Sequence, residues 1–196
     1  QDHAMPTPNP QALDFLLTRR SRPAKTLVAP VPDRNQLEPI LRAALRAPDH
    51  GKLEPWRLIV LERPALERLA ALVNERGAAL GIDPDKITKN HDQFSQANLA
   101  VAVIEAPVIA DKIPAIEQTY SAGAVCLQLL NAALAAGWGA NWLSGWASHD
   151  RSFVERGLGL APHERIAGFI HIGTERAAPP ERPRPNMQEK VTWVSR

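Results

Sequence analysis

The chain has 196 residues, of which 44% are hydrophobic and 22% charged, and its formal net charge is +2. This length and composition predict one globular domain that can bury a sizeable core. Because basic and acidic residues are interleaved, the sequence argues against a dedicated nucleic-acid-binding protein, which would need a basic face. No run of 18 or more apolar residues is present, so we expect no membrane span.

The single cysteine and the first residues of the chain suggest the cellular compartment and the start of the folded domain. Cys126 is the one cysteine in the sequence, so no internal disulfide can form, and a reducing compartment is the natural location. No secretory signal pattern is visible, and we expect a cytoplasmic protein. We interpret residues 1–8 as the remainder of an expression tag, and expect residues 9–196 to form one domain with an extended C-terminal tail.

The first third of the chain predicts two helices. Asn9 and Pro10 are a plausible cap and first residue for a helix over 10–19, followed by an extended connection as far as Pro32. Asp33 and Gln36 resemble a capping box at the start of a second helix, which Pro48 ends. Pro39 is awkward inside that helix and predicts a late start or a kink.

The middle of the chain predicts two strands and two helices. WRLIVL (56–61) and LAVAVI (99–104) are apolar runs typical of buried strands. A helix is expected from Pro64 to about Gly77. The segment 78–98 is less regular, with Asp83 and Pro84 beginning another short helix.

The last third predicts a buried helix, a core strand and an irregular tail. Residues 116–136 are apolar almost all round, as in a central helix, and ANWLSG (140–145) is expected to be a strand end or turn. A short helix capped by Ser148 or Asp150 precedes a strand, RIAGFIHIG (165–173). The segment 177–185 should be extended, and KVTWVSR alternates as a strand does. Helices around a small apolar sheet make the expected fold class α+β.

Three segments contain residue types suited to ligand binding. Arg19, Arg20, Ser21 and Arg22 are either a cationic helix end or a phosphate clamp, since an arginine fork binds phosphate in a bidentate way. Arg46, His50 and Lys52 lie before a Pro-Trp step and would suit a planar anionic ligand, or form only a polar loop. The glycines of AAGWGANWLSG (135–145) either admit a ligand to the backbone or make a tight turn. That segment has no GxGxxG pattern, and the histidines have no metal-binding spacing.

Four segments, in this order, resemble the nitroreductase family of flavoenzymes. They are LLTRRSRP, ILRAALRAPDHGKLEPWRLIVL, GANWLSG and IAGFIHIGT. The resemblance covers residues 11–175. The sequence is similar above all to the short, minimal-size branch of the family. The resemblance implies an α+β nitroreductase-like fold, in which a central, mostly antiparallel sheet is flanked by helices. It also implies an intertwined homodimer with FMN at the subunit interface, and NADH or NADPH as electron donor.

The resemblance also assigns site residues. The FMN-binding set that it implies is Arg19, Arg20, Ser21, Arg46, His50, Trp142, Leu143 and Ser144, with Arg46 and His50 coming from the other subunit. The nicotinamide nucleotide is expected at Ala132, Ala133, Leu134, Ala135, Ala136 and Gly137. The chemistry would belong to the flavin, with Arg20 and Lys52 as candidates to stabilise its reduced form.

The expected activity is a two-electron, ping-pong reduction of nitroaromatic, quinone or enone-like acceptors. Three positions depart from the pattern. Leu53 and Glu54 replace an Asn and a Gln found in many relatives, and Leu143 stands where the short branch has Arg. Leu143 and the small size of the chain leave open a flavin- or nucleotide-binding module that stores or senses the cofactor, and an unrelated anion-binding protein is a third alternative.

Overall fold

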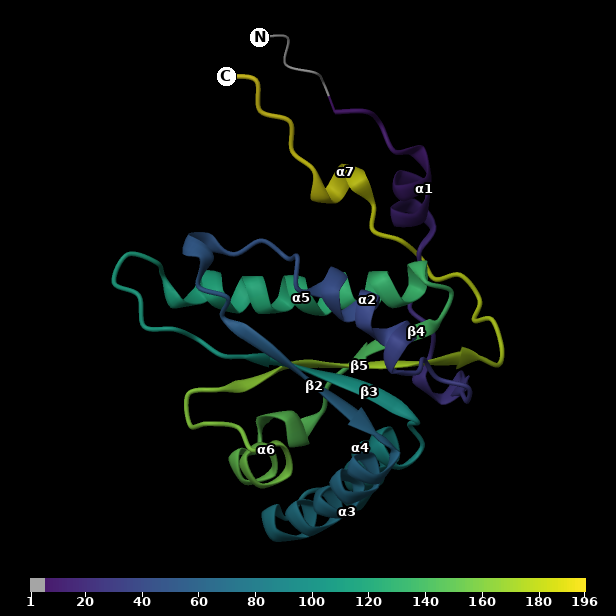
Figure 1. Cartoon of the computed structure of the whole chain (residues 1–196), viewed down its shortest axis with the longest axis vertical. Coiled ribbons are helices and arrows are strands. Elements are labelled where there is room, and N and C mark those ends of the chain that lie inside the picture. Colours follow the sequence, from purple (N-terminus) through teal and green to yellow (C-terminus); the bar gives the residue numbers. More distant parts are fainter. Residues whose placement is uncertain (1–5) are drawn as a thin grey trace.

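A five-stranded sheet forms the centre of the structure, a computed structural model that describes residues 6–196 (Figure 1). Of the expected tag remainder, residues 1–5 lie outside the described residues, and 6–8 have no regular secondary structure. The strand order is β1-β5-β3-β2, β4 pairs with β5, and every pairing is antiparallel. The strands are β1 (Leu27–Val28), β2 (Trp56–Glu62), β3 (Leu99–Glu105), β4 (Gly139–Leu143) and β5 (Arg165–Glu175).

Helices cover both faces of this sheet. In Figure 1, α2 and α5 lie on one face and α3, α4 and α6 on the other, while α1 and α7 project away from the sheet. The helices are α1 (Pro10–Thr18), α2 (Arg34–Ala44), α3 (Arg63–Leu80), α4 (Pro84–Ser95), α5 (Ala115–Ala135), α6 (Arg151–Leu158) and α7 (Met187–Lys190). Within residues 6–196, none of these helices has the length and apolar character that a membrane crossing requires.

Two apolar cores form because β3 is buried along its whole length. Val101 and Val103 face the core under α2 and α5, and Ala102 and Ile104 face the core under α3, α4 and α6. The second core includes Phe94 and Phe169, whose rings meet edge to face with centroids 5.2 Å apart. The expected α+β class with a mostly antiparallel sheet is confirmed.

Cys126 lies on the buried side of α5 and is fully enclosed in the core that this helix covers. Burial raises the pKa of its thiol to about 12. The side chain is therefore held as the neutral thiol and packs as a small apolar group.

Several predicted boundaries need correction. The capping box of Asp33 and Gln36 is confirmed, but α2 begins directly at Arg34, because the box satisfies its first N–H groups even with Pro39 inside the helix. Helix α3 continues past Gly77. This glycine allows α3 to pack closely on Ile87, because a Cβ there would lie 2.6 Å from that side chain. The helix ends at Gly81, which adopts φ 65°.

Three further segments differ in part from expectation. The helix expected to begin at Asp83 and Pro84 is confirmed as α4, but its 12 residues make the region 78–98 more regular than expected, since Phe94 anchors the helix in the core. The 140–145 segment is largely strand β4. The tail segment 191–196 pairs with no strand among the described residues, and the short helix α7 precedes it.

One buried side chain makes stability depend on pH. His171 on β5 is 2% exposed, and its Nε2 has no hydrogen-bond partner within residues 6–196. Burial lowers the pKa of this imidazole to about 4, against about 6.5 in an unfolded chain. Between these values the unfolded state binds more protons, so the free energy of unfolding rises with pH through this window and is fully present above it.

We therefore expect His171→Leu to remove part of the acid sensitivity. From pH 7.5 to pH 5, the wild type should lose about 2 kcal/mol through this group, and the variant should not. Urea unfolding at both pH values measures the difference. His149→Leu, at an exposed position, is the control and should behave as the wild type. Equal acid sensitivity in His171→Leu and the wild type would contradict the assignment.

Candidate functional site

A cluster of arginines forms where α1 ends. The backbone N–H of Arg19 donates to Phe15 and closes the helix, and the chain then turns through Arg20 and Ser21. Arg19 Nη2 donates to Ser21 Oγ at 3.2 Å, and Arg20 Nη1 donates to the Ser21 carbonyl at 2.8 Å. Ser21 thus fixes both guanidinium groups beside each other.

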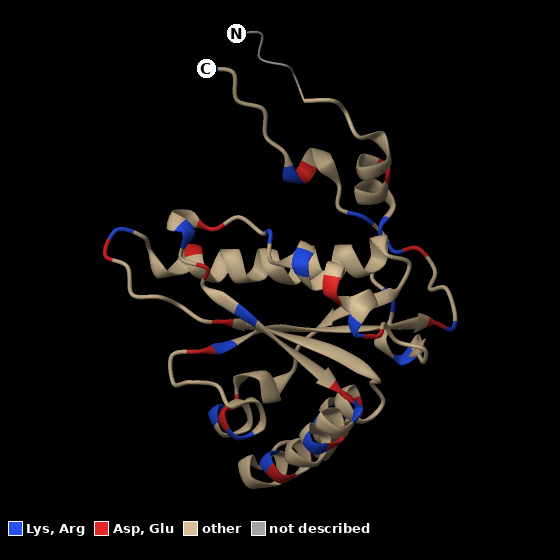
Figure 2. Ribbon diagram, in the orientation of Figure 1, with Lys and Arg blue, Asp and Glu red and all other residues tan. Residues whose placement is uncertain are grey.

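The C-terminal tail crosses this cluster and adds a third cation. Arg20 Nη2 donates to the Pro180 carbonyl, and Arg184 Nη2 donates both to the Arg19 carbonyl and to Glu181. Within residues 6–196, Glu181 is the one carboxylate that pairs with these three arginines, and its oxygen is 3.9 Å from Arg20 Nε, too far for a hydrogen bond. Figure 2 shows these basic segments meeting at the base of α1.

The cluster has spare positive charge and spare donors. The buried Nε atoms of Arg19 and Arg20 have no hydrogen-bond partner within residues 6–196. Burial lowers the pKa of Arg19, and the neighbouring charges of Arg184 and Arg20 lower it further. Uncompensated, partly buried guanidinium groups are costly unless an anion binds them, so this cluster suits a phosphate or carboxylate.

Arg22 has a different role from its neighbours. Its backbone N–H donates to the Ala140 carbonyl on β4 at 2.8 Å, and its side chain pairs with Glu175 at 3.2 Å. Its charge is therefore compensated within the chain. The residue joins the arginine cluster to β4, two positions before Trp142.

The end of β4, the strand to which Arg22 bonds, carries an exposed aromatic side chain. The Trp142 indole is 39% exposed and lies against Gly168 on β5, where any Cβ would collide with the ring. Leu143 is half-buried and Ser144 is exposed. Asn90 fixes the turn that follows, since its Oδ1 accepts from the backbone N–H of Ala147 at 3.1 Å.

A second group of polar side chains follows α2. Arg46, His50 and Lys52 are all exposed. His50 Nδ1 lies 3.2 Å from a carboxylate oxygen of Glu117 in the first turn of α5. Ser121 Oγ donates to the Pro48 carbonyl at 2.8 Å and holds the same loop against that helix.

The structure does not bring the two groups together within one chain. His50 lies at the first turn of α5, whereas Arg22 bonds to β4, just after the last turn of that helix (Figure 1). From Glu117 to Ala135 the helix rises about 27 Å. Within one chain, the arginine cluster and the His50 loop therefore lie at opposite ends of α5, and we refer to these two candidate groups as half-sites.

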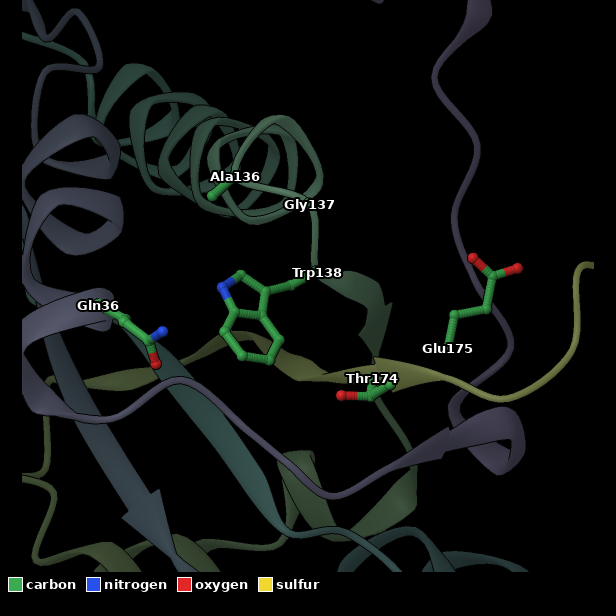
Figure 3. Close-up of a pocket in the computed structure, with 6 residues that line it drawn as sticks. All are labelled: Gln36, Ala136, Gly137, Trp138, Thr174 and Glu175. Carbon is green, nitrogen blue, oxygen red and sulfur yellow. The ribbon is translucent and has the colours of Figure 1, made fainter.

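The segment expected to bind nicotinamide nucleotide is only partly accessible. Ala133 is fully buried, and Ala132 and Leu134 pack against the core. The last three positions, 135–137, are exposed. Figure 3 shows the Trp138 indole projecting into the space between α2 and β5. A cavity of about 490 Å³ there is lined by Gln36, Ala136, Gly137, Trp138, Thr174 and Glu175.

Comparison with known proteins assigns the family. Residues 16–174 match the model of the Nitroreductase family. The chain belongs to the nitroreductase family. The relative from Escherichia coli strain K12 named "Putative NAD(P)H nitroreductase YdjA" is 36% identical over 163 residues, covering 83% of this chain and 87% of the relative.

Solved nitroreductase structures share the fold. The nitroreductase-like family protein of Bacillus cereus has a TM-score of 0.77 at 25% identity, with 97% of this chain and 99% of that chain covered. The FMN and NADPH-dependent nitroreductase NfnB of Sphingopyxis sp. strain HMH has a TM-score of 0.71 at 19% identity, over 94% and 99% of the two chains.

Sequence reasoning missed three side chains that organise the half-sites. Arg184 and Glu181 belong to the arginine cluster, although they follow it by more than 160 residues. Glu117 orients His50 from α5. The Arg-rich tail was visible in the sequence, but its contact with the cluster is a tertiary feature that no local pattern encodes.

We expect inorganic phosphate to stabilise this protein through the arginine cluster. At about ten times its Kd, phosphate should raise Tm by about 3–6 °C relative to chloride of equal ionic strength, since it binds only the folded state. Differential scanning fluorimetry measures the shift. Arg20→Gln should lose most of it, whereas Arg42→Gln, on the exposed face of α2, should keep it. An unchanged shift in Arg20→Gln would place the anion elsewhere.

Proposed function

We propose that this chain is an FMN-dependent NAD(P)H oxidoreductase that works as a homodimer, with each FMN between the two subunits. The observation that carries the proposal is the arginine cluster with spare charge and unpartnered buried Nε atoms. Family membership and the name of the Escherichia coli relative support the reaction class. The acceptors that we propose are nitroaromatic, quinone or enone-like compounds, reduced by two electrons in a ping-pong sequence.

The described residues fit FMN at its phosphate end. A phosphate dianion would take up the spare charge of Arg19, Arg20 and Arg184, and Ser21 keeps two of these forks in register. Trp142 and Ser144, at the end of β4, are exposed and are our candidates for contacts with the ring system.

The second half-site suits the electron-rich edge of a reduced ring. His50 and Lys52 can present N–H donors and positive charge, and Arg46 lies on the same loop. Donors preorganised where negative charge develops stabilise that charge. When bound, FMN would carry two electrons from NAD(P)H to the acceptor. We assign no side chain as acid or base, because solvent can supply the proton.

A two-fold dimer would unite the half-sites. An axis perpendicular to α5 reverses the direction of that helix, so the partner's first turn would lie near this chain's last turn. The outer face of α5 is suited to such a contact. Ile116, Tyr120 and Leu127 are 52%, 68% and 46% exposed, and the space beside Gly123 is open. Exposed apolar side chains in a row along one helix mark an interaction surface.

The projecting segments suit the same dimer. No residue of α1 is buried, and its Leu17 is 73% exposed. In the tail, Trp193 is 89% exposed and alternates with Val191. Strand β2 lies at the sheet edge and could accept such a segment from the partner. Strand pairing of residues 191–196 thus remains a prediction, now between subunits.

Reconstitution with FMN should give a yellow protein. Anaerobic NADH or NADPH should bleach the bound flavin, and one of the proposed acceptors should restore its absorption. Failure to gain FMN would contradict the proposal. Bound flavin that neither nucleotide bleaches would favour storage or sensing.

Replacing Arg19 and Arg20 by Ala should raise the Kd for FMN at least a hundredfold, because each charge-assisted hydrogen bond contributes about 1.5–3 kcal/mol. Flavin fluorescence quenching measures the Kd. Arg42→Ala, an exposed arginine of α2, is the matched control and should retain the wild-type value. Wild-type affinity in the double variant would remove the cluster from the FMN site.

Leu127→Glu should convert the dimer to monomers, because it places a charge in the centre of the proposed α5 contact. Light scattering coupled to size exclusion measures the mass. Leu80→Glu, at the exposed end of α3, is a control of nearly equal exposure, 47% against 46%. A Leu127→Glu protein that stays dimeric would contradict the α5 interface.

A further inference from the structure

The loop before β2 has an unusual backbone. Gly51, Lys52 and Glu54 have φ values of 80°, 54° and 47°, in the left-handed region. Non-glycine residues rarely adopt this conformation, and they hold it only where the surrounding structure imposes it. Such strain is concentrated at ligand-binding and catalytic sites. The loop includes His50 and Lys52 of the second half-site.

One carboxylate holds the middle of this loop. Asp49 Oδ1 accepts from the backbone N–H of Leu53 at 2.6 Å and from that of Glu54 at 3.2 Å. The two bonds close the chain over the intervening residues, which include the left-handed pair Gly51 and Lys52. The carboxylate is therefore placed to favour a backbone path that these residues would otherwise avoid.

The two ends of the loop are fixed independently of Asp49. Ser121 on α5 donates to the Pro48 carbonyl at 2.8 Å and accepts from Trp56 Nε1 at 3.0 Å. Gly51 also packs so closely on Ile113 that a Cβ would collide with its Cδ1. With both ends attached to α5, losing the Asp49 bonds should release the centre of the loop and leave the fold intact.

We propose that Asp49 is a positioning residue for the cofactor site. Its carboxylate holds residues 50–54 in the conformation that presents His50 and Lys52 to the flavin bound at the partner's arginine cluster. Asp49 itself acts through the backbone and does not touch the flavin. The inference rests on the proposed function and extends it to a residue to which the sequence analysis assigned no role.

The test compares Asp49→Ala with Asp49→Asn. Asparagine keeps the acceptor oxygen, so its Kd for FMN should stay within about threefold of the wild type, while alanine should raise the Kd at least tenfold. Asp83→Ala is the matched control: it removes an aspartate that caps α4 through the Asp85 N–H, and it should leave the Kd unchanged. Thermal unfolding of each protein without FMN reports the structural cost, which should be similar for Asp49→Ala and Asp83→Ala.

Each possible result either supports or overturns the positioning role of Asp49. Wild-type affinity in Asp49→Ala, or equal losses in the alanine and asparagine variants, would overturn the positioning role. An Asp49→Ala chain that does not fold would assign Asp49 to the stability of the fold and overturn it equally. If the wild-type protein binds no FMN, the proposed function itself fails, which separates that failure from failure of the Asp49 inference.

Discussion

Helix α5 sets the distance between the two groups of ligand-binding candidates. Its 21 residues lie across one face of the sheet, and its buried side, including Val125 and Leu129, fixes it in the core. Because an α-helix rises by a fixed amount, about 1.5 Å per residue, it holds the polar loop at its first turn apart from the arginine cluster beyond its last turn. If both groups bind one ligand, as we propose, a second chain has to contribute one of them.

The same helix also exposes apolar surface between the two groups. Its outer face exposes Tyr120 and Leu127, and α1 and α7 project away from the body (Figure 1). Burial of this face by a second copy would satisfy the apolar surface and would also cover the exposed polar loops. Cofactor binding and subunit association are then two consequences of one packing arrangement.

Local sequence patterns predicted local structure well. The Asp33–Gln36 capping box and the doubly buried β3 follow directly from residue type and spacing. Patterns failed where tertiary contacts decide. Gly77 had the appearance of a helix end, yet it makes room for Ile87. Arg184 meets Arg19 across 165 residues of chain, and the left-handed backbone at Lys52 depends on a carboxylate three positions earlier. Composition encodes none of these contacts.

A mixed dimer tests the split site most directly. One subunit would carry Arg19→Ala and Arg20→Ala, its partner Arg46→Ala and His50→Ala, with two affinity tags to isolate the heterodimer. If each site takes arginines from one subunit and the loop from the other, both defects fall in one site, and the second site is wild type. The account predicts one FMN per heterodimer at wild-type Kd, with neither parent homodimer binding at that affinity. A heterodimer without any wild-type site would contradict it.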